Sequence, residues 1–367
     1  MTTWHHGELP TPEEARFNLS SHVFESEDTG TQHVFYDSLG DNIYELWWRG
    51  SEAAHPNKLA PGRGPLTSYV NEDTRTQHVF YLDLLKGNHI WEISWGGGGP
   101  MSHGDLMPAS DPRLIAAEDI PTSHLFRADG TNHVFYRTLN NHVAELAWRG
   151  DEVPRQRDLT VARNGVAPLA DDGPSSYVFG DTQHVFYNSG GRIIELSWLG
   201  SSGDLIWRDL IATATGKAPQ AVGRPTTHVF DFENTQHVFY VGDNGHIIEL
   251  WWRPGEAPHP EDLTDQSGGA PLAVFGSLPV SHVFDFENTQ HVFYVADNGH
   301  IREIWWEIGG AKRPEDLTKR SGAAPIHSDV LRLPISSHVF KKERTQHLFY
   351  VAAADNRLTV MELWSQP

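Results

Sequence analysis

Residues 289–306 read TQHVFYVADNGHIREIWW, and closely similar stretches recur along the whole chain. Residues 281–306 repeat residues 227–252 almost letter for letter. The histidine of this element occurs seven times, at His33, His78, His133, His184, His237, His291 and His347. Neighbouring copies are separated by 45 residues (33 to 78) at the least and by 56 residues (291 to 347) at the most. A period of about 40 to 50 residues is typical of one four-stranded blade of a β-propeller.

One repeat unit contains signals for four strands and a tight turn. Residues 281–284 and 289–295 are dense in β-branched and aromatic residues, which favour strands. Residues 297–299, Asp-Asn-Gly, predict a hairpin turn because Asn and Gly accept positive φ angles. A third strand is predicted at residues 301–306. The fourth, edge strand is predicted at residues 314–318, 261–264 and 207–210 in three of the units.

The two ends of the chain complement each other. The last unit ends at Glu362-Leu363-Trp364 with only three residues left, so it lacks a fourth strand. The N-terminal stretch from Trp4 to Leu9 resembles the fourth strand at residues 207–210. We therefore expect residues near 3 to 9 to join the last unit and cover its open edge. The sequence predicts an all-β fold, namely one seven-bladed β-propeller domain over residues 1–367, with four-stranded blades and a ring closed by the N-terminal strand.

Composition excludes several classes of partner. The chain has 28 Lys and Arg against 48 Asp and Glu, a formal charge of −20 that would repel a phosphate backbone. No apolar run is long enough to span a bilayer, and the N-terminus lacks the basic and apolar regions of a signal peptide. We expect a soluble protein without nucleic-acid partners or membrane insertion, located in the cytoplasm or secreted by another route. The absence of cysteine excludes disulfides and thiolate metal sites, and it is compatible with either compartment.

A glutamate accompanies the repeated histidine in every unit. It occurs at Glu45, Glu92, Glu145, Glu195, Glu249, Glu303 and Glu362. Alternation along a strand places each of these side chains on one face of its blade. Two interpretations follow: a histidine–glutamate hydrogen bond that fixes the register of neighbouring strands, or a pair that reaches outward to hold a ligand hydroxyl.

In each unit this glutamate begins a four-residue motif, Glu-Leu-Trp-Trp at residues 45–48, whose last two positions differ in character. The fourth position is Trp in six units and Ser365 in the last, which is typical of packing between blades. The third position is Trp47, Ser94, Ala147, Ser197, Trp251, Trp305 and Trp364 in the seven units. Because the C–H face of a sugar stacks well on indole, the variable Trp predicts a binding surface that only some blades carry. Plain variation in a core layer is the alternative.

The repeat resembles that of the fucose-specific β-propeller lectin superfamily. The resemblance rests on Gln-His-Val-Phe-Tyr, an Asp/Asn-Gly turn and Ile-x-Glu followed by Trp-Trp, and it covers all seven units. It implies sugar sites in clefts between blades, each formed by an Arg on the second strand, a Glu on the third and a neighbouring Trp or Tyr. The glutamate carries over to Glu45, Glu249, Glu303 and their equivalents. The arginine does not, since His33, His237 and His291 take its place, and that family usually has six blades.

We expect a carbohydrate-binding protein without catalytic activity, with several glycan sites between or on the blades. The expected ligand-binding residues are His33, Glu45, Trp47, His237, Glu249, Trp251, His291, Glu303, Trp305, His347, Glu362 and Trp364. No cofactor and no catalytic residue is expected, because phosphate-loop, His-Glu-x-x-His and nucleophile-elbow motifs are all missing. No metal is expected either, because Asp-Phe-Glu-Asn at 231–234 and 285–288 lacks calcium-loop spacing.

Two other functions stay open. One is a scaffold for protein partners, which a large exposed apolar patch would favour. The other is a polysaccharide lyase or glycosidase with one site in the central channel. Residues 96–121 and 150–175 depart from the repeat, and His103 in the first of these segments is the residue considered for such chemistry. The sequence is also compatible with a homo-oligomer.

Overall fold

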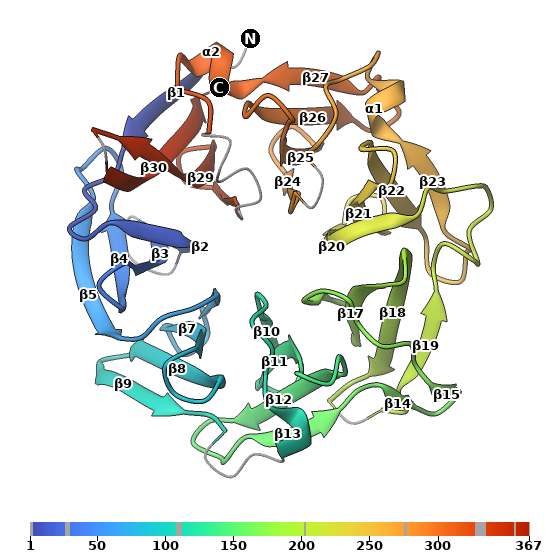
Figure 1. The fold of residues 1–367 in the computed structure, drawn as a ribbon, viewed down its shortest axis with the longest axis horizontal. Helices are drawn as coiled ribbons and strands as arrows, with labels where there is room; N and C mark the ends of the chain where they lie inside the picture. Colours follow the sequence, from blue (N-terminus) through green and yellow to red (C-terminus); the bar gives the residue numbers. More distant parts are fainter. Residues whose placement is uncertain are drawn as a thin grey trace.

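Seven antiparallel sheets surround a common axis, as Figure 1 shows. The computed structural model describes residues 3–25, 30–107, 112–201, 203–274, 277–326, 335–355 and 357–366. Each sheet has four strands and forms one blade. In each of the first six blades the strands follow chain order from the axis outward. The predicted seven-bladed, all-β architecture is therefore confirmed.

The first four blades lie in the N-terminal part of the chain. Blade I contains β2 (Ala15–Phe24), β3 (Thr31–Ser38), β4 (Asn42–Trp48) and β5 (His55–Pro61). Blade II contains β6 (Leu66–Asn71), β7 (Thr76–Asp83), β8 (His89–Gly96) and β9 (Gly99–Asp105). Blade III contains β10 (Thr122–Phe126), β11 (Thr131–Arg137), β12 (Val143–Arg149) and β13 (Arg155–Asp158). Blade IV contains β16 (Ser175–Phe179), β17 (Thr182–Ser189), β18 (Arg192–Leu199) and β19 (Ile206–Asp209), and the hairpin β14 (Val161–Ala162) and β15 (Gly165–Val166) precedes it. A short 3-10 helix, η1 (Pro112–Leu114), precedes β10.

The last three blades complete the ring. Blade V contains β20 (Ala221–Phe230), β21 (Thr235–Gly242), β22 (Ile247–Trp252) and β23 (His259–Asp262). Blade VI contains β24 (Val280–Phe284), β25 (Thr289–Val295), β26 (Ile301–Glu307) and β27 (Arg313–Asp316). Blade VII contains β28 (Ser336–Phe340), β29 (Thr345–Ala354), β30 (Arg357–Gln366) and the N-terminal β1 (Thr3–Glu8). No helix among the described residues is long and apolar enough to cross a membrane.

The predicted fourth strands need a correction at their ends. β23 and β27 stop at Asp262 and Asp316, where the sequence predicted two more strand residues. The short helices α1 (Leu263–Gln266) and α2 (Leu317–Ser321) begin directly after them. The cause is helix capping, because the carboxylate of Asp316 accepts a hydrogen bond from the backbone N–H of Lys319 at 2.9 Å.

The N-terminal strand closes the ring as expected. β1 pairs antiparallel with β30 over six residue pairs, from Thr3 opposite Gln366 to Glu8 opposite Met361. Trp4 lies opposite Ser365, the one position in the repeat where the packing Trp is missing. Trp4 is buried and packs edge-on against Phe293 of blade VI, with ring centroids 6.4 Å apart. The first strand therefore supplies the tryptophan that the last unit lacks.

A tryptophan–phenylalanine contact joins every blade to the one before it. The pairs are Trp48–Phe349, Trp95–Phe35, Trp148–Phe80, Trp198–Phe135, Trp252–Phe186, Trp306–Phe239 and Trp4–Phe293, with ring centroids 5.8–6.4 Å apart. All seven phenylalanines have an exposed fraction of 0%. Edge-on and tilted aromatic pairs at this separation are favourable beyond the area that they bury. The prediction that this tryptophan packs between blades is confirmed.

A second ring, made of hydrogen bonds, also runs from blade to blade. The innermost strand of each blade carries a His or Tyr whose polar atom contacts the amide oxygen of a Gln or Asn in the next blade. The pairs are His22–Gln77, Tyr69–Asn132, His124–Gln183, Tyr177–Gln236, His228–Gln290, His282–Gln346 and His338–Gln32, at 2.5–2.9 Å. This ring explains why Gln or Asn precedes the repeated histidine in every unit.

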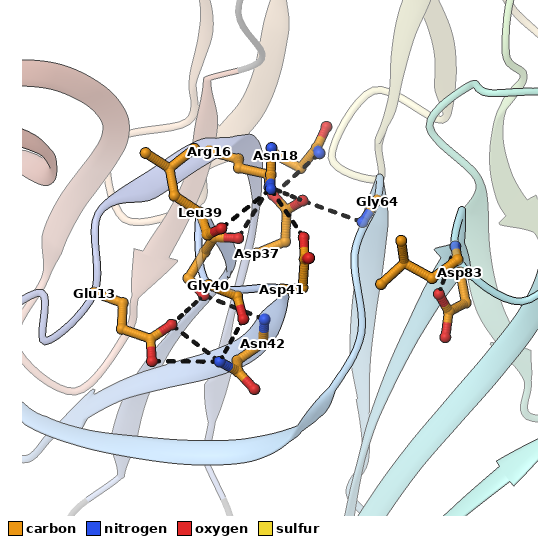
Figure 2. A network of polar contacts seen from close by, with 12 residues as sticks. Glu13, Arg16, Asn18, Asp37, Leu39, Gly40, Asp41, Asn42, Gly64 and Asp83 are labelled. Atoms are coloured by element: carbon orange, nitrogen blue, oxygen red, sulfur yellow. Dashed lines mark hydrogen bonds and ion pairs between the residues drawn. The ribbon is translucent and has the colours of Figure 1, made fainter.

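In blade I, a polar network holds the turn that joins β3 to β4 (Figure 2). The Arg16 guanidinium donates to the backbone carbonyl of Ser38 and to the carboxylate of Asp41, both at 2.9 Å. The buried Asp37 accepts a hydrogen bond at 3.1 Å from the backbone N–H of Gly64, which precedes blade II. Gly64 has a φ of +142° and a Cβ there would lie 2.1 Å from a backbone oxygen, so only glycine allows this contact.

The inner strands leave a small cavity on the axis. Its volume is about 160 Å³, and its lining comes from the innermost strands or from the segments that lead into them, mostly with Ser, Thr, Pro and aliphatic residues. Arg224 is the only ionisable residue among the described residues that line it. The guanidinium of Arg224 donates to the backbone carbonyl of Ile120 at 3.2 Å, so this side chain links blade V to the segment that leads into blade III.

Candidate ligand-binding site

The repeated histidine and glutamate form the same contact in every blade. His Nδ1 lies 2.6–2.8 Å from Glu Oε1 in all seven pairs. The two residues belong to adjacent strands, as the pairing of β25 with β26 shows for His291 and Glu303. The hydrogen bond between strands that the sequence suggested is therefore present throughout the ring.

A threonine extends this contact in five of the blades. The hydroxyl of Thr31, Thr76, Thr235, Thr289 or Thr345 lies 2.7–2.9 Å from Nε2 of the repeated histidine. Both ring nitrogens are then occupied by protein groups. The imidazole is consequently a poor ligand donor in those blades, and Glu Oε2 is the polar atom of the pair that remains for other contacts.

Different blades give this second carboxylate oxygen different partners. In blade I the amide of Asn57 donates to Glu45 at 3.2 Å. In blade IV Arg208 of β19 forms an ion pair with Glu195 and lies 4.9 Å from the ring of Trp252 in blade V. In blade V the amine of Lys312, which belongs to blade VI, lies 3.4 Å from Glu249.

Nearby cations lower the pKa of two of these glutamates, and a third lacks such a contact. Burial alone would raise the pKa of Glu249, but Lys312 and His237 lower it below its ordinary value. Burial would also raise the pKa of Glu195, but His184 and Arg208 lower it below its ordinary value. Glu303 has no cation in contact with its carboxyl: burial, reinforced by the carboxylate of Glu315 and opposed only in part by Arg320, raises its pKa to about 8. Glu249 and Glu195 are therefore ionised at neutral pH, while Glu303 is mostly protonated.

This contrast predicts opposite responses to neutral substitutions. Glu303→Gln should leave stability unchanged or raise it by about 1–3 kcal/mol at pH 7, because the native carboxyl is already neutral there. Glu249→Gln should cost about 1–3 kcal/mol, because it leaves the Lys312 amine without its buried carboxylate partner. Since the native pKa of Glu303 is raised, its contribution to stability is present below pH 4.5 and is lost as pH rises towards about 8. Urea unfolding at pH 5 and pH 8 measures both variants, and equal costs for the two would contradict this assignment.

The third-position tryptophans are half-buried rather than fully buried. This holds for Trp47, Trp251, Trp305 and Trp364. Each lies opposite a His or Arg on the outer strand: His55, His259, Arg313 and His5, respectively. The ring of Trp251 stacks on His259 at 4.6 Å, and the Arg313 guanidinium lies 4.5 Å from the ring of Trp305. These indoles therefore keep some exposed surface next to the repeated glutamate.

Three large cavities lie between consecutive blades. The cleft between blades V and VI has a volume of about 360 Å³ and includes His237, Glu249, Trp251, Trp306 and Lys312. The cleft between blades II and III, about 760 Å³, includes His78, Glu92, Ser94 and Trp148. The cleft between blades III and IV, about 660 Å³, includes Glu145, Ala147 and Arg157. Each cleft thus contains the repeated glutamate and the third-position residue of its first blade.

The structure brings His237, Glu249 and Trp251 together in one of these clefts. The other expected site residues take equivalent positions in blades I, VI and VII, as the strand registers show. Sequence reasoning missed the cations beside the glutamates, Arg157, Arg208 and Lys312. A signal for two of them exists: outer strands end in Asp158 and Asp209, and the residue before that Asp lies opposite the glutamate.

His103, the residue considered for catalysis, belongs to the outer strand β9 of blade II. Its Nε2 lies 2.7 Å from the hydroxyl of Tyr81, and its ring packs on Trp91. The expectation that His103 would lie in the central channel is therefore wrong, because residues 99–105 pair with β8 as the fourth strand of blade II, with one register shift between Ser94 and Gly96.

One group of potential metal ligands occurs among the described residues. Ligand atoms of His246, Asp262 and Asp265 lie within 4.8 Å of one another. His246 Nδ1 is already 2.7 Å from Asp262, and Asp262 caps α1. The same contact recurs as His89–Asp105, His142–Asp158 and His300–Asp316. The pair is a repeated tie between the third and fourth strands, so the cluster does not point to a metal.

Comparison with solved structures identifies the fold. A lectin from Burkholderia pseudomallei, BP39L, aligns with a TM-score of 0.68 and 13% identity over 96% of each chain. A lectin from Aleuria aurantia, described as six-bladed with a novel fucose recognition mode, aligns with a TM-score of 0.52 and 14% identity over 83% of this chain and 96% of its own. AofleA from Arthrobotrys oligospora gives a TM-score of 0.52 and 16% identity over 86% and 90%. The likeness to β-propeller lectins that the repeat suggested is therefore confirmed for the fold. Neither a protein-family model nor a curated protein matches the sequence.

Proposed function

We propose that this protein is a non-catalytic carbohydrate-binding protein whose glycan sites are the clefts between consecutive blades. The observation that carries the proposal is the cleft between blades V and VI. There an ionised carboxylate, an amine and an indole, from Glu249, Lys312 and Trp251, meet in one cavity. Sugar hydroxyls both donate and accept hydrogen bonds, and the C–H face of the ring packs on aromatic surface.

The size and position of the cleft fit this proposal. A volume of about 360 Å³ lies at the lower end of the range for small-molecule pockets, about 300–1,000 Å³. Similar propellers include one described as having a novel fucose recognition mode and one, SapL1, solved in complex with alpha methyl fucoside. In our proposal, Glu45 and Trp47 form a further site of the same design in which His33 orients the glutamate, and the equivalent trios in blades VI and VII do the same.

A glycan array followed by calorimetric titration tests this function. The array should retain the protein on one class of glycan. Titration of the purified protein with that sugar should then give a stoichiometry above one. Retention on no glycan at all would overturn the proposal.

Adjacent tryptophans in blade V provide a matched pair for locating the site. Trp251→Ala should weaken glycan binding in that cleft by about 1 kcal/mol, roughly fivefold, and should change stability little because the indole is half-buried. Trp252→Ala should instead cost about 3–5 kcal/mol of stability, because its ring is 2% exposed and packs on Phe186. Calorimetric titration and thermal melting measure the two effects. Equal destabilisation by both substitutions, with glycan binding intact, would contradict the assignment.

A further inference from the structure

The cleft between blades III and IV differs from the others in its third-position residue. Ala147 occupies that position, and Arg155 lies opposite it on β13. In blade VI the equivalent residues are Trp305 and Arg313, and the guanidinium lies on the indole. The alanine side chain has no aromatic ring on which the Arg155 guanidinium could lie. Arg155 is exposed and makes no hydrogen bond, ion pair or ring contact with any described residue.

A second arginine of β13 is equally free. Arg157 lies opposite Glu145, as Arg208 lies opposite Glu195 in the next blade. Arg208 forms an ion pair with its glutamate, whereas Arg157 has no ion pair or hydrogen bond within the described part of the chain. Arg155 and Arg157 are two residues apart on one strand, so both side chains leave the same face of the blade. Both line the cleft of about 660 Å³.

A hairpin that occurs only here among the described residues forms a wall of the cleft. β14 and β15 pair as a two-stranded sheet, and Asn164 at their turn bonds to both backbone groups of Trp207 in blade IV, at 2.7 and 3.0 Å. Arg163 of this hairpin is matched by Asp204 at 2.5 Å. The hairpin is thus fixed to the next blade, and its own cation is neutralised.

The charged side chains that line this cleft therefore carry more positive than negative charge. Glu145 Oε1 is taken by His133 at 2.7 Å, and Arg155 and Arg157 both remain without an anion. The cleft between blades V and VI differs, because Lys312 lies 3.4 Å from Glu249 and 3.2 Å from Glu261. Two unpaired guanidinium groups facing one cavity are unusual in a chain whose formal charge is −20.

We propose that the cleft between blades III and IV binds an acidic sugar, one that carries a carboxylate or a sulfate group. The planar guanidinium forms paired hydrogen bonds with both kinds of anion, which ammonium groups do not do as well. The proposal deepens the proposed function, on which it rests, by assigning this one cleft a ligand class of its own, the acidic sugars. The remaining Glu145 oxygen is then available to accept from a sugar hydroxyl.

Calorimetric titration with matched sugars tests the assignment. The probes are a methyl glucoside, the methyl glucuronide and the 6-sulfated methyl glucoside, together with a short single-stranded oligonucleotide. We expect at least one acidic sugar to bind tenfold or more tightly than the neutral one, and its affinity to fall as salt is raised. The acidic sugar that binds more tightly, the glucuronide or the sulfated glucoside, shows whether the cleft recognises a carboxylate or a sulfate ester. Equal affinity for all three sugars, or tight binding of the oligonucleotide instead, would overturn the proposal.

The variants exploit the repeat. Arg155→Gln with Arg157→Gln should abolish the preference for the acidic sugar. The single variant Arg157→Lys should retain only part of it, because lysine lacks the paired donors. Arg313→Gln changes the equivalent position in blade VI and should leave the preference intact. Unchanged preference in the double variant would contradict the site. If neutral glycans bind but acidic ones do not, this inference alone fails, whereas failure of every glycan overturns the proposed function as well. Thermal melting checks that each variant is folded.

Discussion

Replacing Trp4 by alanine is expected to destabilise the whole protein by about 3–5 kcal/mol, the usual cost of truncating a buried tryptophan. Trp4 is 5% exposed and fills the place that Ser365 leaves empty against Phe293. Because its strand closes the ring, the loss falls on the contact between blades VI and VII. Removal of residues 3–9 should cost more than this single change, since the paired edge of β30 is then exposed as well.

Thr3→Ala is the matched control for the Trp4 variant. Thr3 belongs to the same strand but is exposed, so its substitution should change the free energy of unfolding by less than about 0.5 kcal/mol. Urea unfolding followed by tryptophan fluorescence and by circular dichroism measures both variants. A Trp4→Ala protein as stable as the Thr3→Ala protein would show that the first strand is not needed for closure.

The second large effect is unfolding in mild acid. Burial, reinforced by neighbouring histidines, lowers the pKa of His22, His124, His228 and His282 of the inner ring to about 3, and His338 follows the same direction. Burial also lowers the pKa of His291 to about 3. The unfolded chain takes up these protons near pH 6.5, but the native ring does not. Stability is therefore complete above about pH 6.5 and is lost as pH falls towards 3.

Three acids oppose this trend only in part, and one of them is Asp172, whose pKa is raised by burial. Burial raises the pKa of Asp37 to about 6, and Glu303 has a pKa of about 8, so both hold protons in the native state that the unfolded chain releases. Six histidines against three acids leave a net difference of about three protons, which corresponds to about 4 kcal/mol per pH unit. Because native domains are stable by about 5–15 kcal/mol, we expect cooperative unfolding near pH 4 to 5.

The repeat itself supplies the variant that tests this account. Tyr177 replaces the histidine in blade IV and donates to Gln236 at 2.8 Å, so a tyrosine can serve in the ring. His228→Tyr should keep the contact with Gln290 and make the loss of stability on acidification shallower by about 1.4 kcal/mol per pH unit. Tyr177→His should steepen it by the same amount. Unfolding free energies measured from pH 7 to pH 4.5 give these slopes, and three identical slopes would show that the ring does not cause the acid response.

The repeat made most of the fold predictable from sequence. The Gln-His-Val-Phe-Tyr element and the Trp-Trp pair determine the second and third strands of each blade, and Ser365 with Trp4 indicates closure. The fourth strands were harder to place because they carry Pro, Gly and charged residues. Residues 99–105, which continue from the glycine run 96–99, looked like an irregular segment, yet they pair with β8 over five positions.

The candidate site was only partly predictable. Alternation along the strands placed each glutamate and its third-position residue on the same side, as the clefts show. The inner hydrogen-bond ring was missed because it joins residues at least 55 positions apart, such as His22 and Gln77, and no single unit contains both partners. Lys312 was missed for the same reason, since it comes from blade VI but faces Glu249 of blade V.

A crystal structure with the best-binding glycan tests the central proposal most directly. We predict sugar density between consecutive blades, with ring hydroxyls within hydrogen-bonding distance of Glu249 and Lys312 and with the sugar against Trp251. Density confined to the axial cavity around Arg224, or to the outer strands, would contradict the placement of glycan sites between the blades.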